Sequence, residues 1–506
     1  MLNRFKSVVE NVMGGIQSIP HNTEKAGNPE SLEIKYAYAR PDFLQLTHEE
    51  VHVSADHASR PILVPRSIER LPWNAGYAEV INGGKSKYNE DQAKAVQFML
   101  KPPSVQPNSE DNRVLSKKKT EPVELKHITT TNLSIKNIPC TYFAIFDGHA
   151  GTGAALMAMN LLDYHVKEKL LDCIDLILSK KGLLPPQSPG AEQNSIYAAT
   201  PRYGMTSKES SISVEDLVCG ALEAAFVEMD NHIARERTTF RIIGGCTALV
   251  ALFFMDKLYV ANAGDCRAVI VKDGTSIQMS KDFTPESERQ RLQYLGYLQP
   301  ELLHNEFTHL DFPRRVHKKD IGKRMLYRDA QMSGWAYKTV EEGDLKFPLV
   351  FGDGKRARVL ATIGVTRGFG DHDLMVHDSN IHIKPFLTPV PEVKVYDMTS
   401  CKHSEDDVLI LGSDGYWDVT SNEKTVDLVL ESLKHYHKGD QSRYTRLAQD
   451  LVMFARGLLK GRAWKTEGDK SASGDDITIF AIPLYRYKPL NLGKSRTSQT
   501  NSIPNS

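Results

Sequence analysis

Cysteine is scarce in this chain of 506 residues: six are present, and no two are spaced as a CxxC pair. Disulfide-stabilised scaffolds need a higher density of cysteines, and zinc sites built from thiolates need closely spaced sets, so neither is expected. Several of the cysteines lie in apolar stretches that read as core. The pattern indicates a protein of a reducing compartment.

Long hydrophobic runs are also missing. The longest, such as Leu249 to Met255, are far shorter than the roughly 18 to 20 apolar residues that cross a bilayer. The first residues lack the apolar segment of a secretory signal, and Leu2 stands where myristoylation needs glycine. We therefore expect a cytoplasmic protein that is either soluble or peripheral on an intracellular membrane.

Neither sign of charge is in excess, because Lys plus Arg and Asp plus Glu number 63 each. No global field draws the chain to nucleic acid, which we do not expect as a partner, and any attraction to anionic lipid must be local. Residues 1–16 form one such local feature, with an apolar helical stripe made of Leu2, Phe5, Val8, Val9, Val12, Met13 and Ile16. This short amphipathic helix either contacts a membrane surface weakly or packs on its own domain.

The chain divides into an amino-terminal extension over residues 1–72, one large domain over 73–485 and a polar tail over 486–506. Two segments inside the domain, 101–137 and 179–213, are polar and contain several prolines. Such segments cannot bury a core, so we interpret them as inserted loops.

Helical and strand patterns alternate between these loops. Helices are predicted over 154–178 and 214–235, the second with the capping-box spacing of Ser213 and Asp216. Strands are predicted over 142–146, 247–254, 258–261, 268–271, 408–411 and 477–482. The short spacing of the 247, 258 and 268 runs favours antiparallel pairing, with helices covering the sheets.

Four of the predicted strands end in an aspartate, usually beside a glycine. These are Asp147 in FAIFDGH, Asp265 in YVANAGD, Asp414 in LILGSDG and Asp475 in SGDDITIF, and the pair Glu90 and Asp91 precedes a further candidate strand. One Asp-Gly pair alone usually marks a turn, but five such acidic positions need another explanation. If sheet pairing gathers them, their charges repel unless cations neutralise them, so the cluster implies metal.

The type of ligand indicates which metal. Carboxylate oxygens with one nearby imidazole favour Mg²⁺ or Mn²⁺ over Zn²⁺. Two such ions about 4 Å apart can share a water, lower its pKa and hold a phosphate oxygen for in-line attack on phosphorus. His149 lies two residues after Asp147, so in extended chain both face one side, and His149 is the candidate proton donor to the leaving oxygen. The alternative is a histidine that only caps or supports the site.

Six motifs occur in an order that resembles the PPM-type (type 2C) metal-dependent serine/threonine protein phosphatases. They are FAIFDGHAG (143–151), GGCTALV (244–250), VANAGDCRAV (260–269), ATIGVTRGFGDHDL (361–374), LILGSDGYWDV (409–419) and SGDDITI (473–479). The amino-terminal MLNRFKSVVENVMGG and the run SADHASRPILVPRSIERLPWNAGYAEVINGGKSKYNEDQA look like the branch that contains phosphatases 1H and 1J.

This resemblance implies an α+β fold in which a sandwich of two antiparallel sheets is flanked by helices on both faces, in four layers. It implies hydrolysis of phosphoserine and phosphothreonine in protein substrates by a metal-bridged water, without a covalent intermediate, using two or three Mg²⁺ or Mn²⁺ ions. By position, the resemblance implies that Asp147 bridges two metals and that the Gly148 carbonyl, Asp414 and Asp475 are further ligands. Glu90 with Asp91 would serve the second metal, and Asp265 with Asp418 would serve a third. His149 would be the general acid.

Three departures from the family pattern concern substrate recognition and charge. Ser86 stands where the family commonly has a phosphate-binding arginine, so Lys85 or Lys87 is the candidate replacement, as a point charge rather than a bidentate group. Asp476 replaces the usual asparagine, which should strengthen cation attraction. The segment 284–360 is longer than usual, and the resemblance implies an enlarged flap beside the cleft. Its basic run 313–324 either docks an acidic or phosphorylated protein surface or is a solvated loop.

Two other functions compete with the phosphatase reading. Ser86 is the one feature that suggests a catalytically weak scaffold, against which the presence of Asp147, His149, Asp414 and Asp475 argues. A membrane-recruited adaptor acting through residues 1–16 is the other alternative; deleting these residues should abolish the function of an adaptor but only relocate an enzyme.

Overall fold

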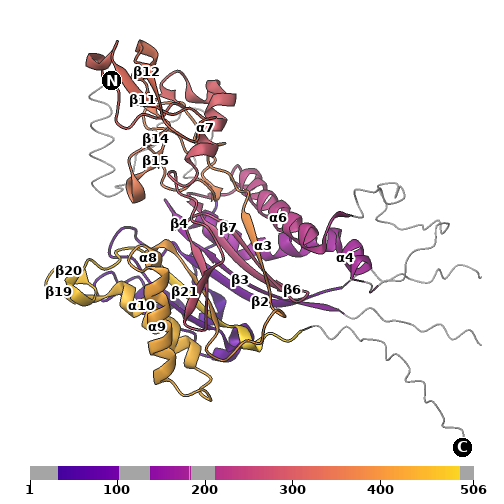
Figure 1. Ribbon diagram of the computed structural model, residues 1–506. Helices are drawn as coiled ribbons and strands as arrows, with labels where there is room; N and C mark the ends of the chain where they lie inside the picture. Colours follow the sequence, from indigo (N-terminus) through magenta and orange to yellow (C-terminus); the bar gives the residue numbers. More distant parts are fainter. Residues whose placement is uncertain (1–31, 102–136, 182, 184–210, 490–506) are drawn as a thin grey trace, which may run out of the picture.

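Two antiparallel sheets of five strands each lie face to face at the centre of the structure (Figure 1). The structure is a computed structural model, and it describes residues 32–101, 137–181, 183 and 211–489. The first sheet has the order β17 (Glu392–Asp397), β7 (Lys257–Ala263), β6 (Ala248–Phe254), β3 (Ile138–Phe146) and β2 (Gln92–Leu100). The second has the order β1 (Gly76–Val80), β21 (Ile477–Pro483), β18 (Val408–Gly412), β8 (Arg267–Lys272) and β9 (Thr275–Gln278).

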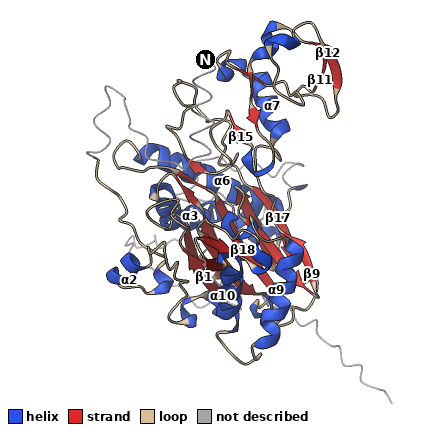
Figure 2. Cartoon of the chain, turned by 90° about the vertical axis from the view of Figure 1, so that its left-hand side faces the viewer, coloured by secondary structure: helices blue, strands red, loops and turns tan. Residues whose placement is uncertain are grey.

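Helices cover the outer face of each sheet, as the two views show (Figures 1 and 2). The first sheet is covered by α3 (Gly153–Asp172), α4 (Ile174–Lys180) and α6 (Val214–Glu236). The second is covered by α8 (Asp414–Trp417), α9 (Asn422–His435) and α10 (Arg443–Arg456). The predicted four-layer α+β fold is therefore confirmed.

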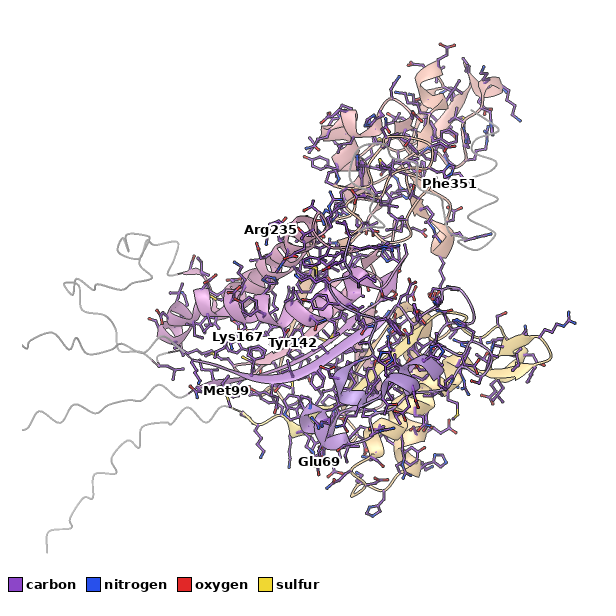
Figure 3. The ribbon with its side chains drawn as sticks, turned by 180° about the vertical axis from the view of Figure 1, so that it is seen from behind. Glu69, Met99, Tyr142, Lys167, Arg235 and Phe351 are labelled. Carbon is purple, nitrogen blue, oxygen red and sulfur yellow. The ribbon has the colours of Figure 1, made fainter. Side chains whose placement is uncertain are left out.

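Strand β3 is buried on both faces, which explains its uninterrupted apolar sequence. Successive side chains of a strand point to opposite faces. Tyr142, labelled in Figure 3, Ala144 and Phe146 face the helices, whereas Phe143 and Ile145 face the second sheet. Because both faces are buried, the run reads as continuously apolar rather than alternating.

Two predicted helices differ in outcome. Helix α6 begins where predicted, since the Ser213 hydroxyl accepts from the amide of Asp216 at 3.0 Å and the Asp216 carboxylate accepts from the amide of Ser213 at 2.8 Å. The single helix predicted over 154–178 is wrong in one respect: α3 ends at Asp172, and α4 starts again after Cys173. Cys173 has φ −110° and ψ 5°, outside the helical range, so the apolar spacing continues across a break in the backbone.

Pairing of the three neighbouring strand runs is also partly different from the prediction. The 247 and 258 runs pair antiparallel as β6 and β7, but β8 pairs with β18 and β9 in the other sheet. The chain turns at Gly264, whose φ is +143° and where a Cβ would lie 2.2 Å from that of Thr247. A turn that only glycine accommodates carries the chain from one sheet to the other.

The segment between β9 and β17 builds a unit beyond one end of the sandwich, with its own apolar core (Figures 1 and 3). It contains one α-helix, α7 (Arg289–Leu298), and four short 3-10 helices. It also contains three strand pairs: β10 (Phe307–Thr308) with β13 (Phe347–Pro348), β11 (Arg324–Tyr327) with β12 (Ala336–Thr339), and β14 (Val350–Phe351) with β15 (Arg358–Val359). We call residues 284–360 the flap. The basic run 313–324 leads into β11.

Smaller elements complete the described chain. A three-stranded sheet joins β16 (Phe369–Gly370), β5 (Gly245–Cys246) and β4 (Gly148–His149), and a hairpin joins β19 (Leu458–Lys460) and β20 (Ala463–Lys465). The helix α2 (His48–Val53) lies in the amino-terminal part, whose Phe43, Leu44 and Leu71 enter the core between the sheets. The predicted helix over 1–16, nearly all of both predicted loops and most of the polar tail lie outside the described residues. Among those described, no helix has the length and apolarity needed to cross a membrane.

Candidate active site

Three aspartates meet where strands of the two sheets end. Asp147 follows β3, Asp265 lies between β7 and β8, and Asp414 begins α8 directly after β18. One carboxylate oxygen from each lies within 4.8 Å of the others, and all three side chains are half-buried. The structure thus brings together three of the predicted ligands, which lie 118, 149 and 267 residues apart in the chain, as their numbering shows.

These carboxyl groups ionise with difficulty when no cation is present. Burial, and next the charge of Asp414, raise the pKa of Asp147 well above its usual range, and burial followed by the charge of Asp265 does the same for Asp414. Burial and the charge of Asp282 raise the pKa of Asp265 to about 7. A group of oxygens that repel one another unless a hard cation joins them fits Mg²⁺ or a similar ion.

The remaining predicted acidic ligands lie around this cluster rather than within it. The charges of Asp475, Asp418 and Asp91 all raise the pKa of Asp414, which places them nearby. Asp475 forms an ion pair with Lys85, and exposed Asp418 pairs with Lys355 of the flap at 2.7 Å. Asp91 is 1% exposed and one of its carboxylate oxygens has no hydrogen-bond partner, which leaves a buried acceptor beside the site.

Glu90 and Gly148 approach each other closely. A Cβ on residue 148 would lie 2.4 Å from the carbonyl oxygen of Glu90, so only glycine fits there. The Glu90 carboxylate accepts from the amide of Gly151 at 2.6 Å, and burial raises its pKa. Gly148 directly follows Asp147 of the cluster, and a backbone amide of the loop that leads into α3 holds Glu90 beside it.

His149 has a partner that the sequence analysis did not single out. Its Nε2 lies 2.7 Å from Oδ2 of Asp371, which follows β16. Burial disfavours the charged imidazole, but the nearby Asp371 carboxylate outweighs this and raises the pKa of His149. A carboxylate in this position orients the imidazole and favours its protonated form. The only signal in the sequence was the position of Asp371 within the motif GFGDHDL.

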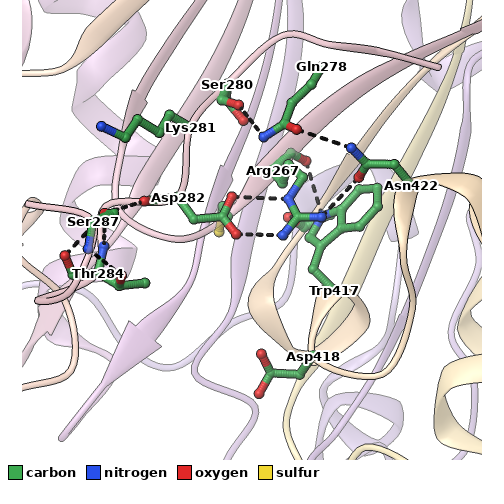
Figure 4. A network of polar contacts seen from close by, with 12 residues as sticks. Arg267, Gln278, Ser280, Lys281, Asp282, Thr284, Ser287, Trp417, Asp418 and Asn422 are labelled. Atoms are coloured by element: carbon green, nitrogen blue, oxygen red, sulfur yellow. Dashed lines mark hydrogen bonds and ion pairs between the residues drawn. The ribbon is translucent and has the colours of Figure 1, made fainter. Parts of the chain in front are cut away.

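A polar network close to Asp418 joins α8 to the second sheet (Figure 4). The guanidinium of Arg267 donates to both carboxylate oxygens of Asp282, at 3.0 and 2.5 Å, and to Asn422 at 2.9 Å. It also lies over the ring of Trp417 at 4.9 Å, and the indole of Trp417 donates to the carbonyl of Arg267 at 3.2 Å. This bidentate and stacked arrangement holds Trp417, the last residue of α8, against β8.

Two buried arginines from the amino-terminal part support the acidic segments, and sequence reasoning missed both. Arg40 donates to the Glu79 carboxylate at 2.7 and 2.6 Å and to the Asp91 carbonyl at 2.6 Å. Arg60, which is 0% exposed, donates to the carbonyls of Ile81, Ser473 and Asp475 at 2.7, 2.8 and 2.9 Å. No local spacing marks either arginine, because their partners lie 39 or more residues away apart from Ile81.

Comparison with known proteins decides the family. The chain is 50% identical to human protein phosphatase 1H over 96% of this chain and 99% of the human one. The chain belongs to the protein phosphatase 2C family. It is 52% identical to protein phosphatase 1H of Xenopus tropicalis and 45% identical to mouse protein phosphatase 1J, with 96% of this chain covered in both, and 99% and 98% of those chains respectively. The protein phosphatase 2C family model matches residues 187–301 and 350–457.

Membership of the protein phosphatase 2C family makes this chain a metal-dependent serine/threonine protein phosphatase whose substrates are phosphorylated proteins. The expected branch, that of phosphatases 1H and 1J, is confirmed by these relatives. A structure of a serine-threonine phosphatase 2C from Toxoplasma gondii aligns with 84% of this chain and 99% of its own at a TM-score of 0.41 and 15% identity, so the family rests on the sequence relatives.

The structure shows the contacts of the residues at which this phosphatase 2C chain departs from the family pattern. Ser86 accepts from the side-chain amide of Asn82 at 2.9 Å and donates to the Tyr88 carbonyl at 2.6 Å, which shapes the loop that carries Lys85 and Lys87. Lys85 reaches Asp475, whereas Lys87 lies over the Tyr88 ring at 4.9 Å. The Asp476 carboxylate accepts from the amides of Asn82 and Glu90, at 2.7 and 3.0 Å, so it joins two loops instead of facing the cluster.

Proposed function

We propose that this phosphatase binds two or three Mg²⁺ or Mn²⁺ ions at the aspartate cluster and hydrolyses phosphoserine and phosphothreonine directly. The convergence of Asp147, Asp265 and Asp414 from three separate segments is the observation that supports it. The proposed ligands are Asp147, the Gly148 carbonyl, Asp414 and Asp475 for the first two ions, with Glu90 and Asp91 at the second, and Asp265 and Asp418 for a third.

When bound, such ions neutralise phosphate charge and lower the pKa of a water so that it becomes a nucleophile near neutral pH. His149, oriented by Asp371, donates a proton to the serine or threonine oxygen as it leaves. Lys85 and Lys87 offer positive charge to the incoming phosphate. The Cys266 thiol lies 4.0 Å from an Asp147 oxygen, but burial raises its pKa well above the usual range, so it stays protonated and does not compete as a nucleophile.

Phosphate release from a phosphothreonine peptide tests this function. The purified chain should hydrolyse the peptide with Mg²⁺ or Mn²⁺, and chelation should abolish the reaction. Asp147→Asn should lower kcat by roughly 10²- to 10³-fold, because phosphoryl transfer depends mainly on stabilisation of charge. Circular dichroism would show that the variant is folded. Hydrolysis at the full rate in metal-free buffer would remove the basis of the proposal.

We also propose a cytoplasmic location with weak membrane-surface contact through residues 1–16. The support is the apolar stripe of that segment and the low number of cysteines, six in 506 residues. In cells, a fluorescently tagged chain lacking residues 1–16 should lose any membrane-associated fraction, while the purified protein keeps its peptide activity. Equal membrane association of both chains would reject the contact.

A further inference from the structure

A pocket of about 320 Å³ opens beside Glu90. Its walls come from the amino-terminal segment 34–36, the loop 86–88, the start of α3 and the loop 241–243. The apolar part of the lining consists of Ile34, Tyr36, Tyr88, Ile242 and Ile243. Glu90 belongs both to this lining and to the proposed metal centre, so a ligand can reach the two sites together.

The walls of the pocket are fixed by contacts of their own. The rings of Tyr38 and Tyr88 stack with centroids 4.4 Å apart, and Ser86 holds the Tyr88 carbonyl. The amide of Arg241 donates to the Glu33 carbonyl at 2.9 Å, which ties the amino-terminal segment to the opposite wall. A pocket with walls held on both sides is largely formed before a ligand arrives.

The charge around the pocket is mostly positive. Lys35, Lys87 and Arg241 line it, and Lys35 is paired with Glu236 at 3.0 Å. Neither Lys87 nor Arg241 forms an ion pair with a carboxylate in the part of the chain that the structure describes. Glu90 is the one acidic residue among the described residues of the lining, and its carboxylate accepts from the Gly151 amide. Apolar walls with two available cations complement an apolar side chain next to an acidic one.

We propose that this pocket selects substrates by binding an apolar side chain within about three residues of the phosphorylated serine or threonine, with an acidic neighbour facing Arg241. The proposal rests on the proposed function, because Glu90 connects the pocket to the centre that takes the phosphate. An extended peptide advances about 3.3 Å per residue. A peptide whose phosphate lies at the metal centre can therefore place a residue close in sequence to the phosphorylated one in the adjoining pocket. The occupant is a protein segment of the substrate.

A set of phosphothreonine peptides tests the proposal. In one otherwise neutral peptide, a Leu-Glu pair is moved through the three positions on each side of phosphothreonine, with Ala-Glu, Leu-Lys and Ala-Lys versions at each position. At one position, the Leu-Glu peptide should have a kcat/KM about tenfold above the Ala-Lys peptide, since roughly 1.4 kcal/mol of binding corresponds to that factor. Equal kcat/KM for all versions at every position would overturn the proposal.

Arg241→Glu provides the matched test in the protein. It should raise KM for the Leu-Glu peptide about fivefold, improve the Leu-Lys peptide, and leave kcat unchanged, because charge reversal alters attraction and not the reacting groups. Hydrolysis of p-nitrophenyl phosphate, which is too small to reach the pocket, should not change. Arg462→Glu, at an exposed arginine in the β19–β20 turn, is the control and should behave as the wild-type chain does.

Other outcomes separate the two proposals. If the wild-type chain shows no metal-dependent hydrolysis of p-nitrophenyl phosphate, the proposed function itself is refuted. If that hydrolysis is present but kcat/KM is the same for all peptides, only the role of the pocket is refuted. A chain lacking residues 1–31 that gains affinity for every peptide alike, with the Arg241→Glu effect gone, would assign the pocket to this chain's own amino-terminal segment and also overturn the proposal.

Discussion

At the scale of single residues, the active site is built from groups that oppose their own ionisation. Asp147, Asp265 and Asp414 face one another, and no lysine or arginine of the described residues forms an ion pair with any of them. Lys85 and Lys355 pair instead with the flanking Asp475 and Asp418. Such an arrangement costs free energy in the metal-free protein, and bound cations recover it. Metal binding and stability should therefore be coupled.

This coupling has a definite dependence on pH. A carboxyl group whose pKa is raised in the folded state, as for Asp265 at about 7, stabilises the folded protein below its unfolded pKa, and the contribution is lost as the pH rises through about 7. In the presence of chelator, repulsion among these carboxylates should thus lower the Tm more at about pH 8 than at about pH 6. Added Mg²⁺ should raise the Tm by at least about 2 °C more at the higher pH. Equal gains at both values, measured by scanning fluorimetry, would contradict this account, and Asp265→Asn should reduce the difference.

The pair of His149 and Asp371 makes a second prediction at this scale. Asp371→Asn keeps the shape but removes the carboxylate that orients the imidazole and raises its pKa. A phosphothreonine peptide needs a proton on its leaving oxygen, whereas p-nitrophenolate leaves without one. We expect kcat for the peptide to fall by about tenfold and kcat for p-nitrophenyl phosphate to fall much less. An equal loss on both substrates would indicate disturbed metal ligands instead of a positioning role for Asp371.

At the scale of elements, helix ends are determined locally where a side chain caps them. The capping box of α6 satisfies backbone amides at its start, and the helix begins where the spacing of Ser213 and Asp216 predicts. The break between α3 and α4 has no such signal, because the apolar positions continue through Cys173.

Replacement of Ser213 measures how much the capping box contributes to the free energy of unfolding. Ser213→Ala should lower the free energy of unfolding by about 1 kcal/mol, since an amide in the first turn loses its acceptor. Urea unfolding followed by tryptophan fluorescence would detect the change, and Ser213→Thr, which keeps a hydroxyl, serves as the control. If the alanine and threonine variants unfold at the same urea concentration, the cap contributes nothing beyond the packing of α6.

At the scale of the whole molecule, residues from the two ends of the chain hold the site. Arg60 contacts carbonyls 413 and 415 residues away, including that of the proposed ligand Asp475. Its guanidinium also lies 5.3 Å from the ring of Trp464. The amino-terminal part before β1 is thereby a component of the centre.

Arg60→Met should therefore affect stability and metal use together. It leaves three carbonyls without their donor, and we expect a loss of about 2–4 kcal/mol in unfolding free energy. The variant should also need more Mg²⁺ for half-maximal activity, because the Asp475 backbone loses its support. Arg66→Met removes a half-exposed arginine paired with Glu50 and should cost less than about 0.5 kcal/mol. Similar losses in both variants would mean that the buried position of Arg60 is not what matters.

The sequence by itself determined the type of chemistry, and its resemblance to the type 2C phosphatases implied the four-layer architecture. Acidic residues at the ends of apolar strands, and helix patterns between them, are local features, and they remain visible in any one segment. It could also identify Asp147, Asp265 and Asp414 as candidates, since each follows a strand that is buried on both faces. Ligand roles and domain boundaries stay predictions.

Only the tertiary structure decided which groups meet. It placed β8 in the second sheet, put Asp371 against His149, turned Asp476 toward backbone amides and brought Arg40 and Arg60 beneath the acidic loops. These contacts join positions far apart in the chain, and their formation depends on the packing of both sheets at once. Local propensity and spacing carry no information about such long-range pairing, which is why it had to be seen in three dimensions.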